Sequence, residues 1–272
     1  MTKLMENKRG LIMGVANDHS IAWGIAKALA DQGAELCLTY QGEALKKRVE
    51  PLAQSVNASL VLPCDVQDDD CMNTLFSVLK QEWGKLDFVV HAIAFSDKEE
   101  LQGRYADTSR ENFKKSMDIS VYSFTQTCKL ASALMTDGGS CLTMSYFGAE
   151  KYIPNYNVMG VAKAALEASV RYLAFDLGTQ NIRVNAISAG PIRTLAASGI
   201  GGFRSMLDWN AVNSAMHQNV SIDDIGQSAL YLLSDMSKNV TGEVIHVDAG
   251  ANKQGMINLS QKEELKALLE SF

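Results

Sequence analysis

The sequence predicts an α/β protein built on a doubly wound parallel sheet of about seven strands, with helices on both faces. Short apolar or β-branched runs alternate along the chain with longer helical patterns, which is typical of a parallel sheet. The chain has 272 residues and shows no internal repeat, low-complexity tract or linker. We therefore expect residues 1–272 to form a single domain.

Individual elements are predicted from the apolar runs and their flanking residues. Strands are expected at 10–15, 34–40, 59–66, 86–95, 139–146, 182–191 and 242–250. Helices are expected at 20–33, 42–55, 68–84, 108–135, 155–177 and 222–234. The three acids at 68–70 suit a helix N-terminus, and Thr108 to Glu111 has the pattern of a capping box. Pro51 is expected to break or kink its helix, and residues 195–206 are loop-like.

Composition disfavours several classes of function. The net charge is −6 and the basic residues do not gather into one block, so we expect no nucleic-acid partner and no membrane partner. No signal peptide is evident, and no run approaches the ~20 apolar residues of a membrane helix. The five scattered cysteines are expected to be reduced and mostly buried, consistent with a cytoplasmic setting. The four histidines have no ligand spacing with them, so no metal site is expected.

The turn after the first strand, "GVANDHSIAWG" (14–24), has features of a phosphate-binding turn. Parallel sheets bind nucleotides beyond the carboxyl ends of their strands, where a helix N-terminus offers free N–H groups to a pyrophosphate. Gly14 permits a tight turn, Ser20 can cap the helix or touch a phosphate, and Gly24 allows close packing of helix on sheet. The pattern differs from the common Gly-x-Gly-x-x-Gly, and a plain strand-to-helix turn is the alternative.

The ends of the next two strands carry polar residues where dinucleotide-binding proteins hold the adenosine. Gln41 can bond ribose hydroxyls but cannot neutralise a 2′-phosphate, which favours NADH over NADPH. Asp65 can accept from the adenine amino group, beside the Val66 backbone; a solvated turn aspartate is the alternative. Lys46 to Arg48 would suit a phosphate, but a surface helical face explains them.

Tyr156 and Lys163 have an unusual spacing. Residues seven apart on a helix turn through about 700°, so both can project from one face, about 10 Å apart along the axis. The commonest single-domain nicotinamide-dependent reductases place a tyrosine four residues before the lysine, where this chain has Met159. Their upstream serine would fall at Thr143, a possible substitute. Packing with a solvated charge is the alternative explanation for the tyrosine–lysine pair, and we assign packing to Tyr152.

The segment "SYFGAEKYIPNYNVMGVAKAALEASVRYLA" with "IRVNAISAGPIRTLAASGI" resembles the bacterial NADH-dependent enoyl-acyl-carrier-protein reductases. These form a divergent branch of the short-chain dehydrogenase/reductase family, marked by Tyr-x6-Lys. The resemblance runs from Gly14 to the strand at 242–250 and implies a Rossmann-type fold, NADH as cofactor and a homotetramer. The chain departs from the family at Ala92 and Ala94, where serine and glycine are usual. The extra methyl group at Ala94 is expected to narrow the pocket.

The resemblance also implies site residues. Catalytic roles fall on Tyr146, Tyr156 and Lys163, and substrate contacts include Ser96 and Tyr156. Cofactor contacts fall on Gly14, Ser20, Ile21, Gln41, Asp65, Val66, Ile93, Lys163, Ile192, Arg193, Thr194, Leu195 and Ala196. Tyr146 would bound the acyl pocket or order a water.

The residue types suit reduction of a conjugated thioester. Hydride adds to the β-carbon of a trans-2-enoyl thioester, and negative charge develops on the thioester oxygen as an enolate. A neutral tyrosine hydroxyl can donate to that oxygen, strengthened by a nearby ammonium. This is the last reduction step of type II fatty-acid elongation. A carbonyl reductase and a non-enzymatic cofactor-sensing protein are the alternative functions, and an enoyl thioester assay discriminates between them.

The glycine-rich stretch around 192–212 is expected to form a substrate lid that excludes water during hydride transfer. An ordinary surface loop is the alternative. Its side chains expected to face the acyl chain are Ala196, Ala197, Ile200, Phe203 and Met206. Arg193 and Arg204 are candidates for contact with an acidic acyl carrier protein.

Overall fold

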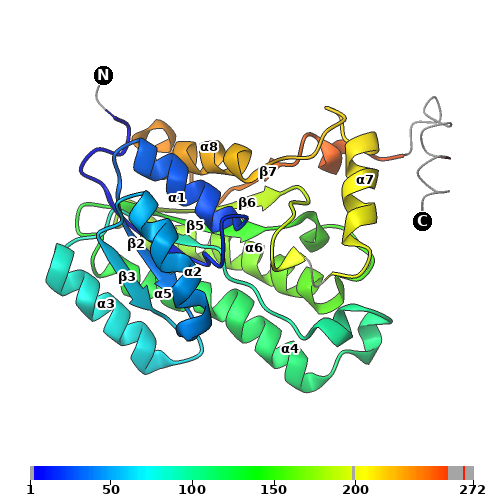
Figure 1. Cartoon of the computed structure of the whole chain (residues 1–272), viewed down its shortest axis with the longest axis horizontal. Coiled ribbons are helices and arrows are strands. Elements are labelled where there is room, and N and C mark those ends of the chain that lie inside the picture. The colour runs from blue at the N-terminus through cyan, green and yellow to red at the C-terminus, as the bar shows by residue number, and fades with distance from the viewer. Residues whose placement is uncertain (1–2, 198–199, 257–265, 267–272) are drawn as a thin grey trace.

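Seven parallel strands form one sheet, in the order β3-β2-β1-β4-β5-β6-β7. The computed structural model describes residues 3–197, 200–256 and 266 (Figure 1). The strands are β1 (Arg9–Met13), β2 (Glu35–Tyr40), β3 (Leu60–Pro63), β4 (Phe88–His91), β5 (Gly139–Ser145), β6 (Ile182–Ala189) and β7 (Val244–Val247). The single-domain, doubly wound sheet predicted from the sequence is confirmed.

Helices cover both faces of the sheet. The α-helices are α1 (Ile21–Asp31), α2 (Gly42–Ser55), α3 (Asp69–Trp83), α4 (Arg110–Met117), α5 (Ser123–Ser132), α6 (Asn157–Gly178), α7 (Phe203–Asn213) and α8 (Ile222–Leu233). Side chains of α3, α5 and α6 pack in one apolar cluster, and those of α1, α2 and α8 in another. Alternation along β1 joins both clusters, because Leu11 and Met13 face the first while Ile12 faces the second. No described helix is long and apolar enough to span a membrane.

The chain reverses direction across the sheet between β1 and β4. It runs outward from β1 to β2 and β3, then crosses back to β4 on the other side of β1. A crevice outside the carboxyl ends of the strands at such a reversal is where open α/β sheets bind nucleotides. The topology therefore places a candidate site beside the residues that follow β1 and β4.

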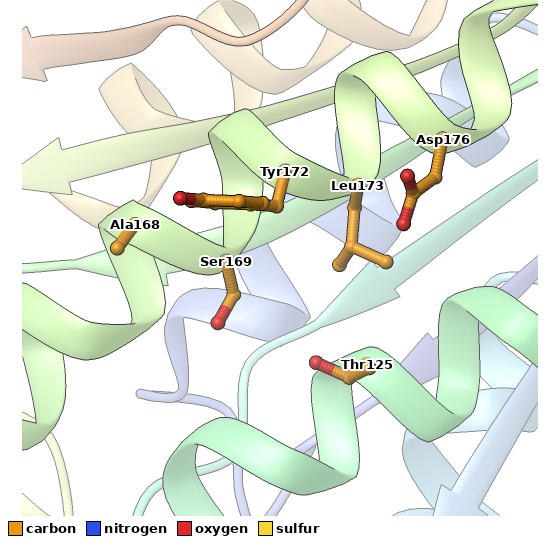
Figure 2. A pocket seen from close by; sticks show the side chains of 6 residues that line it. All are labelled: Thr125, Ala168, Ser169, Tyr172, Leu173 and Asp176. Carbon is orange, nitrogen blue, oxygen red and sulfur yellow. The ribbon is translucent and has the colours of Figure 1, made fainter.

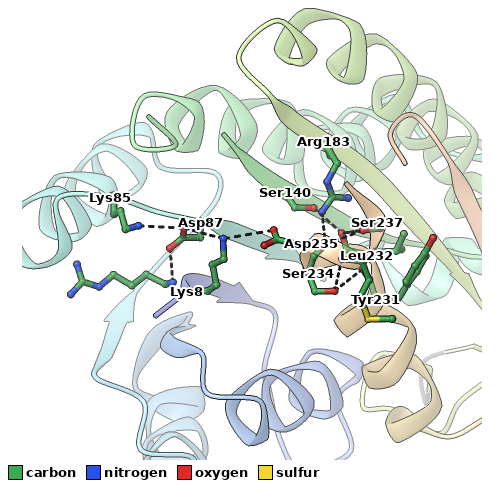
Figure 3. A network of polar contacts seen from close by, with 12 residues as sticks. Lys8, Lys85, Asp87, Ser140, Arg183, Tyr231, Leu232, Ser234, Asp235 and Ser237 are labelled. Carbon is green, nitrogen blue, oxygen red and sulfur yellow. Dashed lines mark hydrogen bonds and ion pairs between the residues drawn. The ribbon is translucent and has the colours of Figure 1, made fainter. Parts of the chain in front are cut away.

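The opposite, amino-terminal edge of the sheet is held by polar contacts (Figure 3). Asp87, just before β4, accepts from the Arg9 amide at 2.8 Å and lies 3.6 Å from the Lys85 ammonium. In β6, the Arg183 guanidinium donates to the carbonyls of Ser234 and Val240. The Lys8 ammonium lies 3.8 Å from the Asp235 carboxylate and so joins segments from the two ends of the chain. All these contacts lie away from the strand ends that carry the site.

Several expected elements differ from the structure. The helix expected at 108–135 consists of α4 and α5 joined by one π-helical turn at Asp118–Tyr122. Its N-cap is Ser109, whose hydroxyl accepts from the Asn112 amide, so the capping box expected from Thr108 is wrong. Helix α2 continues through Pro51 without a break. Helix α7 begins within the stretch expected to be loop-like, residues 195–206, and extends to Asn213, where the sequence predicts no helix.

Candidate functional site

Gly14 marks the closest approach of the turns that follow β1 and β4. Its φ is +102°, and a Cβ there would lie 2.1 Å from the Ala92 carbonyl oxygen. Any side chain would force the two turns apart, so the glycine is required by both backbone conformation and space. This close approach lies at the topological reversal, where a nucleotide site is expected.

Ser20 organises the turn that precedes α1. Its hydroxyl accepts from the amides of Ala16 at 3.0 Å and Asn17 at 3.1 Å. It makes no capping bond to α1, so the capping role considered for Ser20 is wrong, and the amides at Ile21 and beyond are not capped by a side chain. Uncapped amides at a helix N-terminus are suited to an anion.

Gly24 serves a different contact from the one expected. A Cβ there would lie 2.3 Å from the carbonyl oxygen of Ile222 at the start of α8. Gly24 therefore allows close packing of α1 on α8, whereas other residues of α1 pack on the sheet, and the two helices lie side by side in Figure 1. This contact helps to fix the position of α1, which directly follows the turn at residues 14–20.

Gln41 and Asp65 meet at the carboxyl ends of β2 and β3. The Gln41 Nε2 donates to the Asp65 carboxylate at 3.0 Å, and the other carboxylate oxygen accepts from the Gln67 amide. Both side chains of the expected adenosine pocket are thus brought together, and Val66 packs beside them against the core. After β4, Ile93 is half-buried. Ser96 forms hydrogen bonds with the Asn112 side chain and does not line the cavity beside Tyr146 that is described below.

Tyr156 lies at the N-cap of α6, and its ring is tightly enclosed. The side chain is only 8% exposed. A Cβ on Gly148 would lie 2.5 Å from the ring, so only glycine fits there. On another side the Tyr146 ring meets it edge-on, with centroids 5.0 Å apart. Burial raises the pKa of the Tyr156 hydroxyl, with the neighbouring Tyr146 adding to the rise, so this group stays a neutral donor.

Lys163, two turns further along α6, is buried at the end of β5. Its ammonium donates to the Met144 carbonyl at 2.7 Å, and the residue is 6% exposed. Burial lowers the pKa of the Lys163 amine to about 8, and the Glu167 carboxylate opposes that fall. The amine is therefore mostly charged at neutral pH.

Three successive residues, the last two of β5 and the one that follows it, contact the N-cap residue of α6 and two residues on the same face of that helix. Met144 accepts from Lys163, the Ser145 hydroxyl donates to the Glu167 carboxylate, and the Tyr146 ring packs on Tyr156. Positions 156, 163 and 167 lie close to whole numbers of helical turns apart, which explains their shared face. Sequence reasoning missed Ser145 and Glu167, although the four-residue step from Lys163 to Glu167 was a usable signal.

Thr143 is unavailable for a catalytic role. It is fully buried, and its hydroxyl donates to the His91 carbonyl at 3.0 Å within the sheet. Met159, where alcohol–ketone reductases carry tyrosine, is buried in the core. Neither position offers a hydroxyl to a substrate carbonyl.

A cavity of about 600 Å³ opens beside Tyr146, between the end of β6 and α7. Of the side chains expected to face the acyl chain, only Met206 lines it. Tyr152, assigned to packing, is 81% exposed and lines the cavity, so that assignment is wrong. Sequence reasoning missed the other wall residues, which include Phe147, Trp209, Asn213, Asp248 and Gln254.

The remaining residues expected in the lid have mixed environments. Ile192 and Ala197 are buried, and the Thr194 hydroxyl accepts from the Ala197 amide at 3.0 Å. Ile200 packs against the core. Phe203 is half-buried, and the exposed residues are Arg193, Leu195, Ala196 and Arg204. Residues 198–199 of the expected lid lie outside the described residues. Ala94 is exposed and is not part of the cavity wall.

Two asparagines on either side of Tyr156 connect it to separate loops. Asn155, with φ +59°, donates to the Gly201 carbonyl at 2.9 Å. Asn157, with φ +32°, donates to the Glu100 carbonyl at 3.2 Å. The backbone around Tyr156 is thus held to the segment before α7 and to the segment after β4.

Known proteins resemble the chain over most of its length. A family described as enoyl-(acyl carrier protein) reductase matches residues 14–252. A Rhizobium meliloti protein named enoyl-acyl-carrier-protein reductase (NADH) 1 is 66% identical over 93% of each chain. A Rickettsia felis enoyl-acyl-carrier-protein reductase (NADH) is 54% identical, covering 93% of this chain and 98% of the relative. The crystal structure of the Anaplasma phagocytophilum reductase in complex with NAD has a TM-score of 0.92 at 61% identity, covering 95% of this chain and 98% of that one. The chain therefore belongs to the enoyl-(acyl carrier protein) reductase family.

Proposed function

We propose that this NADH-dependent enoyl-acyl-carrier-protein reductase uses Tyr156 as the hydrogen-bond donor to the substrate and Lys163 as the anchor of the nicotinamide ribose. The substrate is a trans-2-enoyl thioester on acyl carrier protein, and the step is the last reduction of type II fatty-acid elongation. The observation that carries the assignment is the register of β5 on α6, which groups Tyr146, Tyr156 and Lys163 at the carboxyl edge of the sheet.

Tyr156 is suited to stabilise an enolate without losing its proton. Its hydroxyl is kept neutral by burial, and its ring is fixed between Gly148 and Tyr146. A fixed donor of this kind needs little reorganisation when charge develops on the thioester oxygen. One such donor lowers the activation barrier by roughly 2.7–4 kcal/mol. Tyr146 contributes by holding that ring and by forming part of the cavity wall.

The residues at the switch point fit a dinucleotide. Gly14 allows the turns after β1 and β4 to lie close together, and the amides that α1 offers to a pyrophosphate are not capped by any side chain. Gln41, Asp65 and Val66 would hold the adenosine, while Ile93 and residues 192–196 would flank the nicotinamide end. NADH supplies the hydride when bound. Lys163 uses one N–H on Met144, which leaves two donors for ribose hydroxyls.

Residues 192–212 are proposed to act as a lid over the cavity. Helix α7, at the right of Figure 1, places Met206 and Trp209 in the cavity wall. Asn155 connects the lid to Tyr156 through Gly201. Exposed Arg193 and Arg204 offer positive charge to an acidic carrier. Charge reversal at Arg204 should raise KM for carrier-linked substrate and spare a coenzyme A analogue; equal effects would remove Arg204 from carrier recognition.

A homotetramer is proposed as the assembly, in a cytoplasmic setting. Tyr172 and Phe175 on α6 are 77% and 88% exposed, a large apolar surface for one helix. Figure 2 shows Tyr172 beside a shallow groove between α5 and α6, with Thr125 opposite Ser169. Light scattering should give four times the chain mass, and Phe175→Lys should reduce it; a monomeric wild type would refute the assembly.

A steady-state assay tests the proposed function. NADH oxidation is followed with a crotonyl thioester and, in parallel, with an acetoacetyl thioester. We expect turnover of the crotonyl substrate and none of the acetoacetyl substrate, because neither Thr143 nor Met159 offers a hydroxyl for alcohol–ketone chemistry. Faster turnover of the acetoacetyl substrate would contradict the proposal.

A further inference from the structure

Glu167 is a buried carboxylate that the proposed chemistry does not use. It is 8% exposed, four residues after Lys163 on the same helix. Residues four apart on a helix have Cβ atoms about 5–6 Å apart, so the carboxylate and the ammonium belong to one buried cluster. Buried glutamates are rare unless a partner compensates their charge, so a specific role is indicated.

Ser145 fixes the orientation of this carboxylate. Its hydroxyl, itself in a residue only 5% exposed, donates to the Glu167 Oε1 at 2.5 Å. The preceding residue, Met144, accepts the bond from the Lys163 ammonium. Two successive residues at the end of β5, Met144 and Ser145, therefore hold the ammonium and the carboxylate, which fixes the two charges relative to each other.

Other titratable and charged groups surround the cluster. Glu150 and His246, which are paired at 2.7 Å between the loop after β5 and β7, lie on the Glu167 side, as does Arg171 of α6. On the Lys163 side, His91 of β4 is fully buried and held neutral, since burial lowers its pKa to about 3. Glu167 is the group whose charge raises the pKa of Lys163 against the effect of burial.

We propose that Glu167, oriented by Ser145, is a positioning residue that keeps the Lys163 ammonium charged at the cofactor site. The inference rests on the role proposed above for Lys163. A neutral amine would be a weaker donor to the ribose hydroxyls and would no longer strengthen the Tyr156 hydroxyl as a donor. The carboxylate thereby sets the upper pH at which the reductase binds and uses NADH.

The pH profile of kcat/KM for NADH tests this role, because it reports ionisations of the free enzyme. In the wild type, kcat/KM should fall above about pH 8 as Lys163 loses its proton. An opposite charge within ~4–6 Å shifts a pKa by about 1–3 units, so Glu167→Gln should move that alkaline limb down by about one unit. The kcat/KM values of the wild type and Glu167→Gln should agree within about threefold at pH 6 and differ about tenfold at pH 8.5.

Two control variants distinguish the role proposed for Lys163 from the role proposed for Glu167. Glu82→Gln removes an exposed carboxylate on α3 and should leave the profile unchanged. Lys163→Arg carries a cation that does not titrate, so it should lose the alkaline limb. If Lys163→Arg keeps the limb, the role proposed for Lys163 fails. If Lys163→Arg loses the alkaline limb but Glu167→Gln leaves that limb at its wild-type pH, only the role proposed for Glu167 is overturned.

A second variant covers the case in which Glu167→Gln does not fold. Replacing the pair together, as Ser145→Ala with Glu167→Met, removes the charge and leaves no unpaired buried polar atom. The same downward movement of the alkaline limb is expected. A uniform loss of activity at every pH would show a purely structural role and overturn the proposal.

Discussion

The Tyr146 ring meets the Tyr156 ring edge-on, with centroids 5.0 Å apart and planes inclined at 71°. Tyr146 directly follows β5, and Tyr156 directly precedes α6. The sheet and the helix therefore each deliver one tyrosine to the same contact. Edge-to-face pairs of this kind contribute about 0.5–1.5 kcal/mol beyond area burial, enough to fix the direction of the Tyr156 hydroxyl.

Tyr156→Phe should lower kcat for the enoyl thioester by about 10²–10³-fold, because one transition-state donor is lost. The dissociation constant for NADH, measured by fluorescence titration, should change less than threefold. Tyr146→Phe keeps the ring contact and serves as the matched control, with a much smaller loss of kcat. Weakened NADH binding with unchanged kcat in Tyr156→Phe would mean that its role is misassigned.

Gln41→Arg should shift cofactor preference toward NADPH. The wild-type glutamine is held by Asp65 and carries no charge to meet a 2′-phosphate. A guanidinium there can bind the phosphate in a bidentate manner, so kcat/KM for NADPH should rise at least tenfold while that for NADH falls. Gln67→Arg, on the far side of Asp65, is the control. An unchanged ratio would place the adenosine ribose elsewhere.

The sequence predicts the sheet and most helices because their signals are local. Asp68 accepts from the amides of Asp70 and Cys71, and Gly84 ends the same helix in a left-handed conformation, as the pattern indicates. Helix α7 escaped prediction because it follows the glycines at 201 and 202 and buries only Leu207, Asn210 and Asn213. Its weak apolar face and glycine-rich start are typical of a loop.

The same distinction between local signals and tertiary packing applies to the site residues. Tyr156 and Lys163 could be paired by counting helical turns, although Tyr156 lies at the N-cap with φ −111° and ψ −23°. The same count does not apply to Tyr152, which precedes the helix and instead lines the cavity. Asp248 and Gln254 approach it only through the packing of β7 beside β6. No local pattern contains that information.

Gly24→Ala should destabilise the fold by about 1–3 kcal/mol, because the added methyl group would meet the Ile222 carbonyl oxygen at 2.3 Å. Urea unfolding gives the free energy. Gly178→Ala is the matched control: it lies at the end of α6 with open space around its Cβ, and it should stabilise by up to about 1 kcal/mol. Equal effects at the two positions would contradict the close packing of α1 on α8.

His91 should make the fold sensitive to acid. It is neutral in the folded state, with a pKa lowered to about 3 by burial, whereas the unfolded chain takes up its proton below about 6.5. Stability from this group is therefore complete above pH 6.5 and is lost toward pH 3, at up to about 1.4 kcal/mol per pH unit. The difference in the free energy of unfolding between the wild type and His91→Asn, measured in urea, should therefore change in favour of the variant as the pH falls across that window. A constant difference from pH 7 to pH 4 would contradict a neutral His91.

Asn155→Gly should weaken substrate binding while sparing the cofactor. The asparagine has φ +59°, which glycine adopts without strain, so the substitution removes the bond to Gly201 and leaves the turn intact. Loss of that bond frees the proposed lid from the residue next to Tyr156. KM for a crotonyl thioester should therefore rise about three- to tenfold, since a neutral hydrogen bond contributes about 0.5–1.5 kcal/mol. Asn57→Gly, at φ +52° after α2, is the control and should leave KM unchanged. An unaltered KM in Asn155→Gly would show that the contact with Gly201 does not help to close the lid on the substrate.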